Sequence, residues 1–187
     1  MFLDFLLGKT SFRSRVRRRD DAANLSVPAP RAEVAKAAPA PGTSISYRPD
    51  LIPKLKDDHE QLRGILEAIE MAFEAGNVAL TVLKLNQFRT MIHSHLLAEN
   101  VGLYVYLRRS LAGDERNHAL VQGFQREMDE IGRSALEFVA KYSDLGRPGH
   151  QGLTVSFAKD LANVGEVLGK RVAREEVTLY PLYRPIR

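Results

Sequence analysis

The sequence predicts an all-α protein, an up-down bundle of four helices that follows a disordered N-terminal tail. Two observations support this fold class. From Leu51 onward, apolar residues recur every three or four positions, which is the spacing of one face of an α-helix. Turn-forming residues divide this region into four such segments, and none of them shows the alternation typical of a strand. Helices joined by short connections pack antiparallel with their apolar faces inward.

The ends of the four predicted helices are marked by turn signals. The first helix runs from residue 51 to near 75, where AGN follows, and the second runs from about 78 to 111, where AGD follows. The third covers about 115–143 and precedes the turn-rich DLGRPGHQG. The fourth covers about 152–182, and Pro185 limits its extension because proline lacks a backbone N–H.

The region before the first helix has a different composition. Residues 20–50 are rich in Ala, Pro and Ser, so they cannot bury enough apolar surface to offset the entropy of ordering. We therefore predict a basic, Ala/Pro-rich disordered tail and linker over residues 1–50 and the bundle over residues 51–187. Of 27 Lys and Arg and 23 Asp and Glu, the tail holds nine and five, which leaves eighteen of each for the bundle.

This charge distribution bears on partners and location. A neutral bundle is a poor match for nucleic acid, whereas the RSRVRRR cluster of the tail suits an acidic protein or a membrane surface. The absence of cysteine excludes disulfides and thiolate metal sites. No apolar run reaches the ~18 residues of a spanning helix, and the opening MFLDFLLGK precedes its basic cluster, which is the wrong order for a secretory signal. We expect a cytoplasmic protein, and its oligomeric state stays open.

Five polar residues interrupt the inward faces of the predicted helices, at similar depths in neighbouring helices: His59, His95, Glu99, Arg171 and Glu175. His95 and Glu99 are four residues apart, so both point from one helix toward one spot. A buried carboxylate without a partner costs several kcal/mol, so a positive charge must lie nearby. The other histidines, His93, His118 and His150, are expected at the surface.

Two sources of that positive charge remain open. In one interpretation the bundle is metal-free and the guanidinium of Arg171 neutralises the carboxylates. In the other, a single metal ion is bound by His59, His95 and Glu99, with Glu175 as a further ligand, since imidazole and carboxylate suit such ions.

These residues resemble a known family. The segment LKDDHEQLRGILEAIE around His59, the unit H95-x-x-x-E99 followed by NVGLYVYL, and RVAREEVTLYPLY around Glu175 resemble the hemerythrin-like, or HHE cation-binding, family over about residues 51–183. In each of the last two segments an aromatic residue lies five positions after the Glu. The resemblance implies a hemerythrin-like four-helix bundle in which two halves, each with a His and an HxxxE unit, hold a pair of non-haem irons.

The second half of this chain departs from the family pattern. Met128 stands where the third helix would present a His, and Arg171 replaces the His of the second HxxxE unit, which leaves only Glu175. Arginine cannot bind a cation because it stays protonated and has no acceptor. The resemblance therefore implies either no cofactor or one non-haem metal ion, with iron as the first candidate.

The function expected on these grounds is that of a regulatory or sensory module with an incomplete metal site. No Ser-His-Asp arrangement or phosphate-binding glycine loop is present, so we do not expect an enzyme. An alternative comes from a weaker resemblance of LNQFRTMIHSHLLAENVGLYVYL and LANVGEVLGKRVAREEVTLYPLY to the Rsd/AlgQ family, helical bundles that bind the sigma subunit of RNA polymerase. That family would imply a protein partner and no metal.

Overall fold

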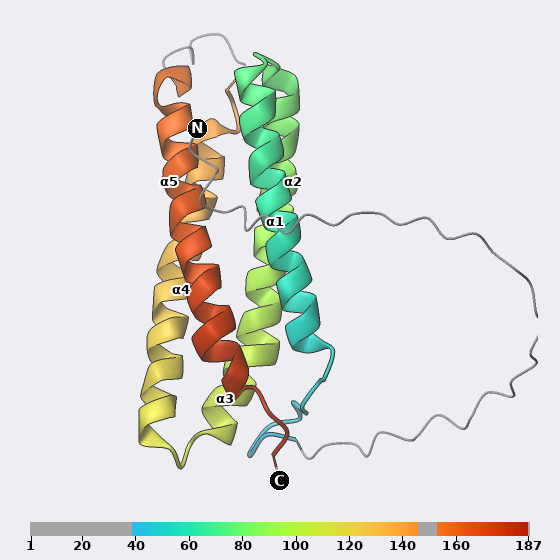
Figure 1. The fold of residues 1–187 in the computed structure, drawn as a ribbon, viewed down its shortest axis with the longest axis vertical. Coiled ribbons are helices and arrows are strands. Elements are labelled where there is room, and N and C mark those ends of the chain that lie inside the picture. The colour runs from blue at the N-terminus through green and yellow to red at the C-terminus, as the bar shows by residue number, and fades with distance from the viewer. Residues whose placement is uncertain (1–38, 146–152, 187) are drawn as a thin grey trace, which may run out of the picture. The chain divides into compact units, whose positions relative to one another are not determined.

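The fold was analysed in a computed structural model, which describes residues 39–145 and 153–186 (Figure 1). Most of the predicted tail, residues 1–38, lies outside the described residues, as does most of the predicted loop after the third helix. The boundary predicted at residue 50 therefore stays a prediction.

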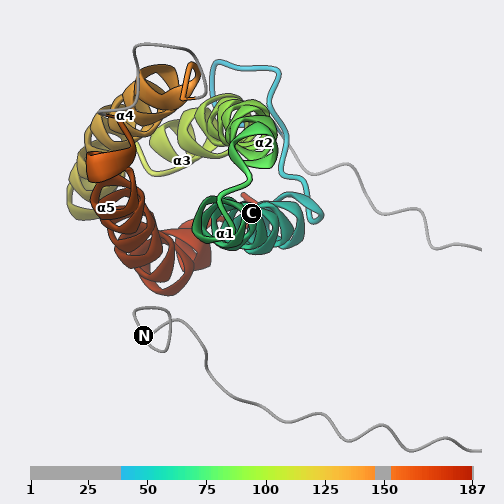
Figure 2. The same cartoon turned by 90° about the horizontal axis from the view of Figure 1, so that it is seen from above.

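The described residues form the predicted four-helix bundle. The helices are α1 (Leu51–Glu74), α2 (Val78–Ala98), α4 (Glu115–Tyr142) and α5 (Leu153–Arg174). Seen from above, the four helices are arranged around a common axis (Figure 2). The all-α prediction is confirmed. Among these helices none is long and apolar enough to cross a membrane.

Two of the predicted helices continue through short segments of other helical types. The helix α2 passes into the π-helix η1 (Glu99–Tyr104) and then into α3 (Val105–Ser110). The helix α5 passes into the π-helix η2 (Glu175–Leu179) and the 3₁₀ turn η3 (Tyr180–Leu182). The sequence periodicity did not predict the π-helical turns.

Local sequence accounts for the helix ends. The side chain of Asn77 accepts a hydrogen bond of 3.0 Å from the backbone N–H of Leu80 and so caps α2, and Asp114 caps α4 in the same way through Asn117. Gly76, with φ of 68°, ends α1 in the left-handed conformation that glycine adopts without strain. The AGN and AGD turns seen in the sequence thus act through these capping residues.

The core consists of two apolar clusters with a polar layer between them. Along α1, Leu55 belongs to one cluster and Leu62 to the other. Leu168 of α5 and Leu179 of η2 are divided likewise. The polar layer lies between these levels and includes His59. Apolar packing on both sides therefore isolates the polar residues from the two ends of the bundle.

Residues 39–50, assigned by the sequence analysis to the linker, pack against the end of the bundle near its C-terminus. Ala40 is buried, and the ring of Tyr47 stacks on that of Tyr183 at 5.0 Å between centroids. The backbone N–H of Arg48 donates a 2.9 Å hydrogen bond to the hydroxyl of Tyr183. The segment packs here because Ile45 and Tyr47 bury apolar surface against the bundle. The low average content of large apolar residues in the segment did not indicate this contact.

Truncation of Phe157 should destabilise the bundle strongly. Its ring is fully buried and contacts Phe73, Phe138 and Tyr142 at centroid distances of 4.4, 5.8 and 4.8 Å. We expect Phe157→Ala to lower the free energy of unfolding by about 3–5 kcal/mol in chemical denaturation. Val155→Ala, at a side chain that is 88% exposed on the same helix, should change it by less than about 0.5 kcal/mol. Equal effects would contradict the assigned core.

Candidate metal centre

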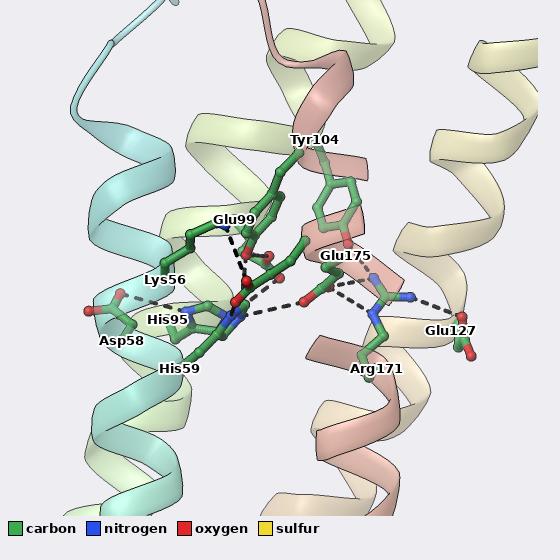
Figure 3. Close-up of polar contacts among 11 residues, drawn as sticks. Lys56, Asp58, His59, His95, Glu99, Tyr104, Glu127, Arg171 and Glu175 are labelled. Atoms are coloured by element: carbon green, nitrogen blue, oxygen red, sulfur yellow. Dashed lines mark hydrogen bonds and ion pairs between the residues drawn. The ribbon is translucent and has the colours of Figure 1, made fainter. Parts of the chain in front are cut away.

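The four residues predicted as metal ligands come together in the polar layer. His59 lies on α1, His95 on α2, Glu99 at the start of η1 and Glu175 at the start of η2. One potential ligand atom from each lies within 4.8 Å of those of the others, and all four side chains are buried. Figure 3 shows them converging from three sides. That they bind a metal stays a prediction.

The two π-helical turns begin at the two carboxylates. In an α-helix, residues five apart lie about 140° around the axis from each other, so Glu99 and Tyr104 would not share a face. The wider π-helical turn brings such residues onto the same side. Accordingly Tyr104 and Tyr180, five residues after Glu99 and Glu175, are both buried and contact the site. The aromatic residues noted in the sequence are thus part of the polar layer.

Carboxylates outside the cluster orient both imidazole rings. The Nδ1 atom of His59 lies 3.1 Å from Oε1 of Glu176, and Nδ1 of His95 lies 3.6 Å from Oδ2 of Asp58. The Nε2 atoms, in turn, are the ones that approach Glu175 and Glu99, at 3.5 and 3.8 Å. A carboxylate within hydrogen-bond distance of the outer ring nitrogen, as Glu176 is for His59, is the usual arrangement for a metal ligand, because it fixes the tautomer that presents the free nitrogen.

Lysines hold these outer carboxylates in place. Lys56 lies 3.2 Å from Glu176, and Lys54 lies 2.6 Å from Asp58. Both lysines are about half exposed, so these ion pairs position the carboxylates but add little to the free energy of unfolding. Each histidine thus belongs to a chain of contacts that runs from the surface to the polar layer.

Tyr180 joins the two halves of the cluster. Its hydroxyl donates a 3.2 Å hydrogen bond to Oε1 of Glu99 and lies 3.2 Å from Nε2 of His59. Its ring stacks on that of His59, with an interplanar angle of 9°. One hydroxyl proton serves only one acceptor at a time, so bonding to Glu99 leaves the nitrogen of His59 free.

Arg171 occupies the other side of Glu175. Its Nε and one terminal nitrogen each lie 2.7 Å from Oε1 of Glu175, and its other terminal nitrogen donates a 2.9 Å bond to Glu127 of α4. It also donates a 2.6 Å bond to the hydroxyl of Tyr104, and its guanidinium lies 4.5 Å above the ring of Phe124. Glu175 therefore presents one oxygen to a guanidinium and the other to the histidine side of the cluster.

Burial dominates the electrostatics of this layer. Burial, and then the proximity of Glu175, raise the pKa of Glu99 well above its usual value, although Arg171 opposes them. Burial and then the nearby His59 lower the pKa of His95 to about 4. Burial works against the charge of Arg171, but the combined effect of Glu175, Tyr104 and Glu99 outweighs it, so the pKa of the guanidinium is raised. The layer thus holds a neutral His95 beside a permanent cation.

Two buried polar atoms have no hydrogen-bond partner among the described residues: Nδ1 of His95 and Oε2 of Glu99. The 3.6 Å separation between His95 and Asp58 falls within ion-pair range but beyond a hydrogen bond. Buried polar atoms are nearly always satisfied in folded proteins. The direct contacts of the protein therefore leave part of this site uncompensated.

The remaining sequence predictions about individual residues can now be placed. Met128 is buried on α4, and Glu127, next to it, forms that helix's ion pair with Arg171. His93 is exposed and His118 is partly exposed, whereas His150 lies outside the described residues. The sequence analysis missed five participants in the site: Asp58, Tyr104, Glu127, Glu176 and Tyr180. Only the two tyrosines had a sequence signal, their fixed distance from the glutamates.

Comparison with known proteins identifies the family. Residues 50–183 match the hemerythrin HHE cation-binding domain. The chain belongs to this family. Searches of curated proteins and of solved structures gave no match. The match covers all four helices of the bundle and every residue of the cluster.

The residues of this hemerythrin-like domain do not fit a pair of irons but do fit one ion. Arg171 and Met128, on α5 and α4, supply no ligand for a second ion, and the guanidinium would repel it. On the other side, two imidazoles and two carboxylates face one another, and no hydrogen-bond partner for Oε2 of Glu99 is found in the part of the chain that the structure describes. A divalent ion at this cluster would compensate that carboxylate.

The neutral state of His95 should make the metal-free protein less stable in acid. The unfolded state takes up a proton near pH 6.5, the ordinary pKa of His, whereas the folded state takes it up only near pH 4. Stability should therefore fall as the pH drops from about 6.5 to about 4, by up to about 3 kcal/mol for this group. The measurement is urea denaturation of chelator-treated protein across this range.

Two variants isolate this effect from that of Glu99, whose raised pKa acts in the opposite direction. His95→Gln should show a shallower loss of stability between pH 6.5 and 4 than the parent protein, whereas His93→Gln, at an exposed position two residues away, should show the parent's profile. Parallel profiles for all three proteins would contradict the assignment.

Removal of the guanidinium of Arg171 should leave the repulsion between the buried carboxylates of Glu99 and Glu175 uncompensated. We expect Arg171→Met to lower the free energy of unfolding by about 3–5 kcal/mol in metal-free protein at pH 7, because it leaves buried Glu175 without its partner. Arg174→Met removes a half-exposed partner of Glu127 and should cost less than about 1 kcal/mol. A small effect of both substitutions would show that Arg171 does not compensate the site.

Proposed function

We propose that this hemerythrin-like protein binds a single non-haem metal ion, with iron as the first candidate, through His59, His95, Glu99 and Glu175. We further propose that it acts in the cytoplasm as a regulatory or sensory module and not as an enzyme. The observation that carries the proposal is the convergence of four buried ligand groups within 4.8 Å, in a family described as cation-binding.

Charge supports one ion in preference to none. Glu99 and Glu175 carry two negative charges when ionised, and Arg171 supplies one positive charge. With His95 neutral, the sum of these charges is −1. The outer carboxylates do not change this sum, since each has its own cationic partner. Either Glu99 or His59 holds a proton, or a cation binds beside Glu99. Direct contacts of the protein leave one oxygen of Glu99 free for that cation.

Charge also supports one ion in preference to two. The guanidinium lies against Glu175 on the side away from His59, and it is held there by Tyr104 and Glu127. Arg171 thus stands in for the charge of a second ion, bound to the carboxylate oxygen that the histidines do not face. Because arginine stays protonated, this substitute does not depend on metal supply or redox state.

The closed character of the site supports a sensory role over catalysis. All four ligand residues are at most 5% exposed, and apolar clusters pack on both sides of their layer. Two surface grooves formed by described residues, one near Pro181 and one near Leu83, are lined by residues away from the cluster. An iron ion bound here would supply a redox-active centre that small species reach more easily than an organic substrate does.

Elemental analysis tests this proposal directly. Untagged protein, purified after growth with added iron, manganese or zinc, should contain about one ion per chain by plasma mass spectrometry, because the cluster offers one set of ligands. His95→Ala and Glu99→Gln should each lower that content at least about tenfold. His93→Ala is the matched control and should keep the parent's content.

Two outcomes would decide against a single ion. A folded protein with far less than one ion per chain would show that Arg171 suffices, and would favour a metal-independent role in binding a partner such as a sigma factor. Two ions per chain would contradict the role given to Arg171. As a check on the register, Arg171→His combined with Met128→His restores the imidazoles of the family pattern and should raise the content toward two.

A further inference from the structure

The hydroxyl of Tyr180 lies inside the cluster of proposed ligands. Its oxygen is 3.2 Å from Nε2 of His59 and 3.2 Å from Oε1 of Glu99. These separations are shorter than the 3.5 Å between Nε2 of His59 and Oε2 of Glu175. They are also shorter than the 3.8 Å between Nε2 of His95 and Oε2 of Glu99. By distance, the Tyr180 oxygen is as much a part of the cluster as the four proposed ligands.

Separations of this size suit ligands of one ion. When bonds of about 2.1 Å leave an ion at right angles, neighbouring ligand atoms lie about 3.0 Å apart. The oxygen of Tyr180 is therefore placed for two roles. Without an ion it donates a hydrogen bond to Glu99, and with an ion it can bind beside Glu99 after a shift of a few tenths of an ångström.

Packing holds the Tyr180 side chain in this position. The residue is 4% exposed, and its ring stacks on that of His59 at 5.9 Å between centroids. Its backbone carbonyl accepts a 3.0 Å hydrogen bond from the N–H of Tyr183, which closes the 3₁₀ turn η3 around Pro181. A ring fixed in this way loses little conformational freedom when its oxygen binds an ion. The oxygen is thus preorganised toward the histidine side of the cluster.

Tyr104 has the equivalent place after Glu99 but faces a cation. Its hydroxyl accepts a 2.6 Å hydrogen bond from Arg171 (Figure 3). The guanidinium stays protonated, so this oxygen is already bound to a permanent positive charge. Among the described residues, the hydroxyl of Tyr180 contacts a histidine, whereas the contact found for that of Tyr104 is the guanidinium. The two tyrosines are therefore not interchangeable.

The chemistry of a phenol distinguishes between ions. The ordinary pKa of a tyrosine hydroxyl is about 10, against about 4 for a glutamate. An ion must carry a high charge to displace the phenol proton, and a bound cation is the largest local charge that can do so. A ferric ion, with its third positive charge, displaces this proton more readily than a ferrous ion. Tyrosine binds iron in this way in one class of haem proteins.

The charge of the buried layer favours the same choice. Histidines that bind an ion are neutral, so the ionised Glu99 and Glu175 together with Arg171 sum to −1. A ferrous ion brings this sum to +1 and a ferric ion brings it to +2. Loss of the Tyr180 proton returns the ferric form to +1. The layer then buries the same net charge in both oxidation states, which limits the desolvation cost of the ferric one.

We propose, building on the single-ion site proposed above, that Tyr180 is a fifth ligand, which binds ferric but not ferrous iron through its phenolate oxygen. When ferric iron binds, the O–H bond of Tyr180 breaks, a bond forms between its oxygen and the ion, and the proton passes to water. With ferrous iron the phenol keeps its proton and its hydrogen bond to Glu99. Tyr180 thus gives the proposed sensory module a residue whose bonding depends on the oxidation state of the ion.

Visible absorption spectroscopy tests the ligand. The full chain, treated with chelator and then loaded with ferric nitrilotriacetate, should develop a phenolate-to-iron charge-transfer band after unbound chelate is removed. Tyr180→Phe keeps the ring and should abolish the band while plasma mass spectrometry still finds iron. Tyr142→Phe, which removes a buried hydroxyl bonded to Ser156 and Asp160 in an apolar cluster, should keep the band. Iron-loaded parent protein without the band would overturn the proposal.

A vibrational measurement on the parent protein does not depend on the folding of any variant. Raman excitation into the band should show phenolate vibrations, and these should shift in protein grown with ring-deuterated tyrosine. Absence of that shift would overturn the proposal. Tyr104→Phe then tests which tyrosine binds, since a band that is lost in this variant and survives in Tyr180→Phe would contradict the assignment.

Comparison of the two oxidation states separates this inference from the proposed function. Anaerobic ferrous iron should bind the parent and Tyr180→Phe with similar affinity, whereas ferric iron should bind the variant at least about tenfold more weakly. The one-electron reduction potential of the bound iron should therefore rise in the variant by at least about 59 mV. An equal loss of ferrous and ferric binding would overturn the role of Tyr180 and leave the single-ion site standing. Parent protein that binds neither ion would contradict the single-ion site itself, and this inference with it.

Discussion

Burial of Glu99 and Glu175 side by side within an apolar bundle is the constraint on which the rest of the polar layer depends. Two carboxylates removed from water repel each other and lose their hydration, so the fold tolerates them only with compensation. Arg171 provides the permanent part of that compensation through its contacts with Glu175. Glu99 accepts a hydrogen bond from Tyr180, and its other carboxylate oxygen has no hydrogen-bond partner within residues 39–145 and 153–186.

The same constraint explains why the long helices are not regular throughout. A purely α-helical segment after each glutamate would turn the aromatic residue five positions later away from the layer. The π-helical turns η1 and η2 keep Tyr104 and Tyr180 inward, where their hydroxyls contact Arg171 and Glu99. A π-helical turn is less favourable than an α-helical one, and it is retained here at the positions where the site needs it.

The two halves of the bundle have different tasks in this member of the hemerythrin family. Helices α1 and α2 present His59 and His95, each oriented from behind by a carboxylate that a lysine holds. Helices α4 and α5 present a cation bound to Glu127 and Glu175 instead of further imidazoles. This asymmetry turns a two-ion architecture into one with ligands for a single ion.

The amino-acid sequence by itself determined the four helices and the depth of their inward polar residues, because helical periodicity and the four-residue spacing of His95 and Glu99 are local properties. It also determined the family, through motifs that are continuous in the chain. Tertiary structure alone decided that Glu127 binds Arg171 and that Asp58 stands behind His95. These contacts join separate helices, and their geometry depends on packing and on the π-helical turns, which periodicity does not encode.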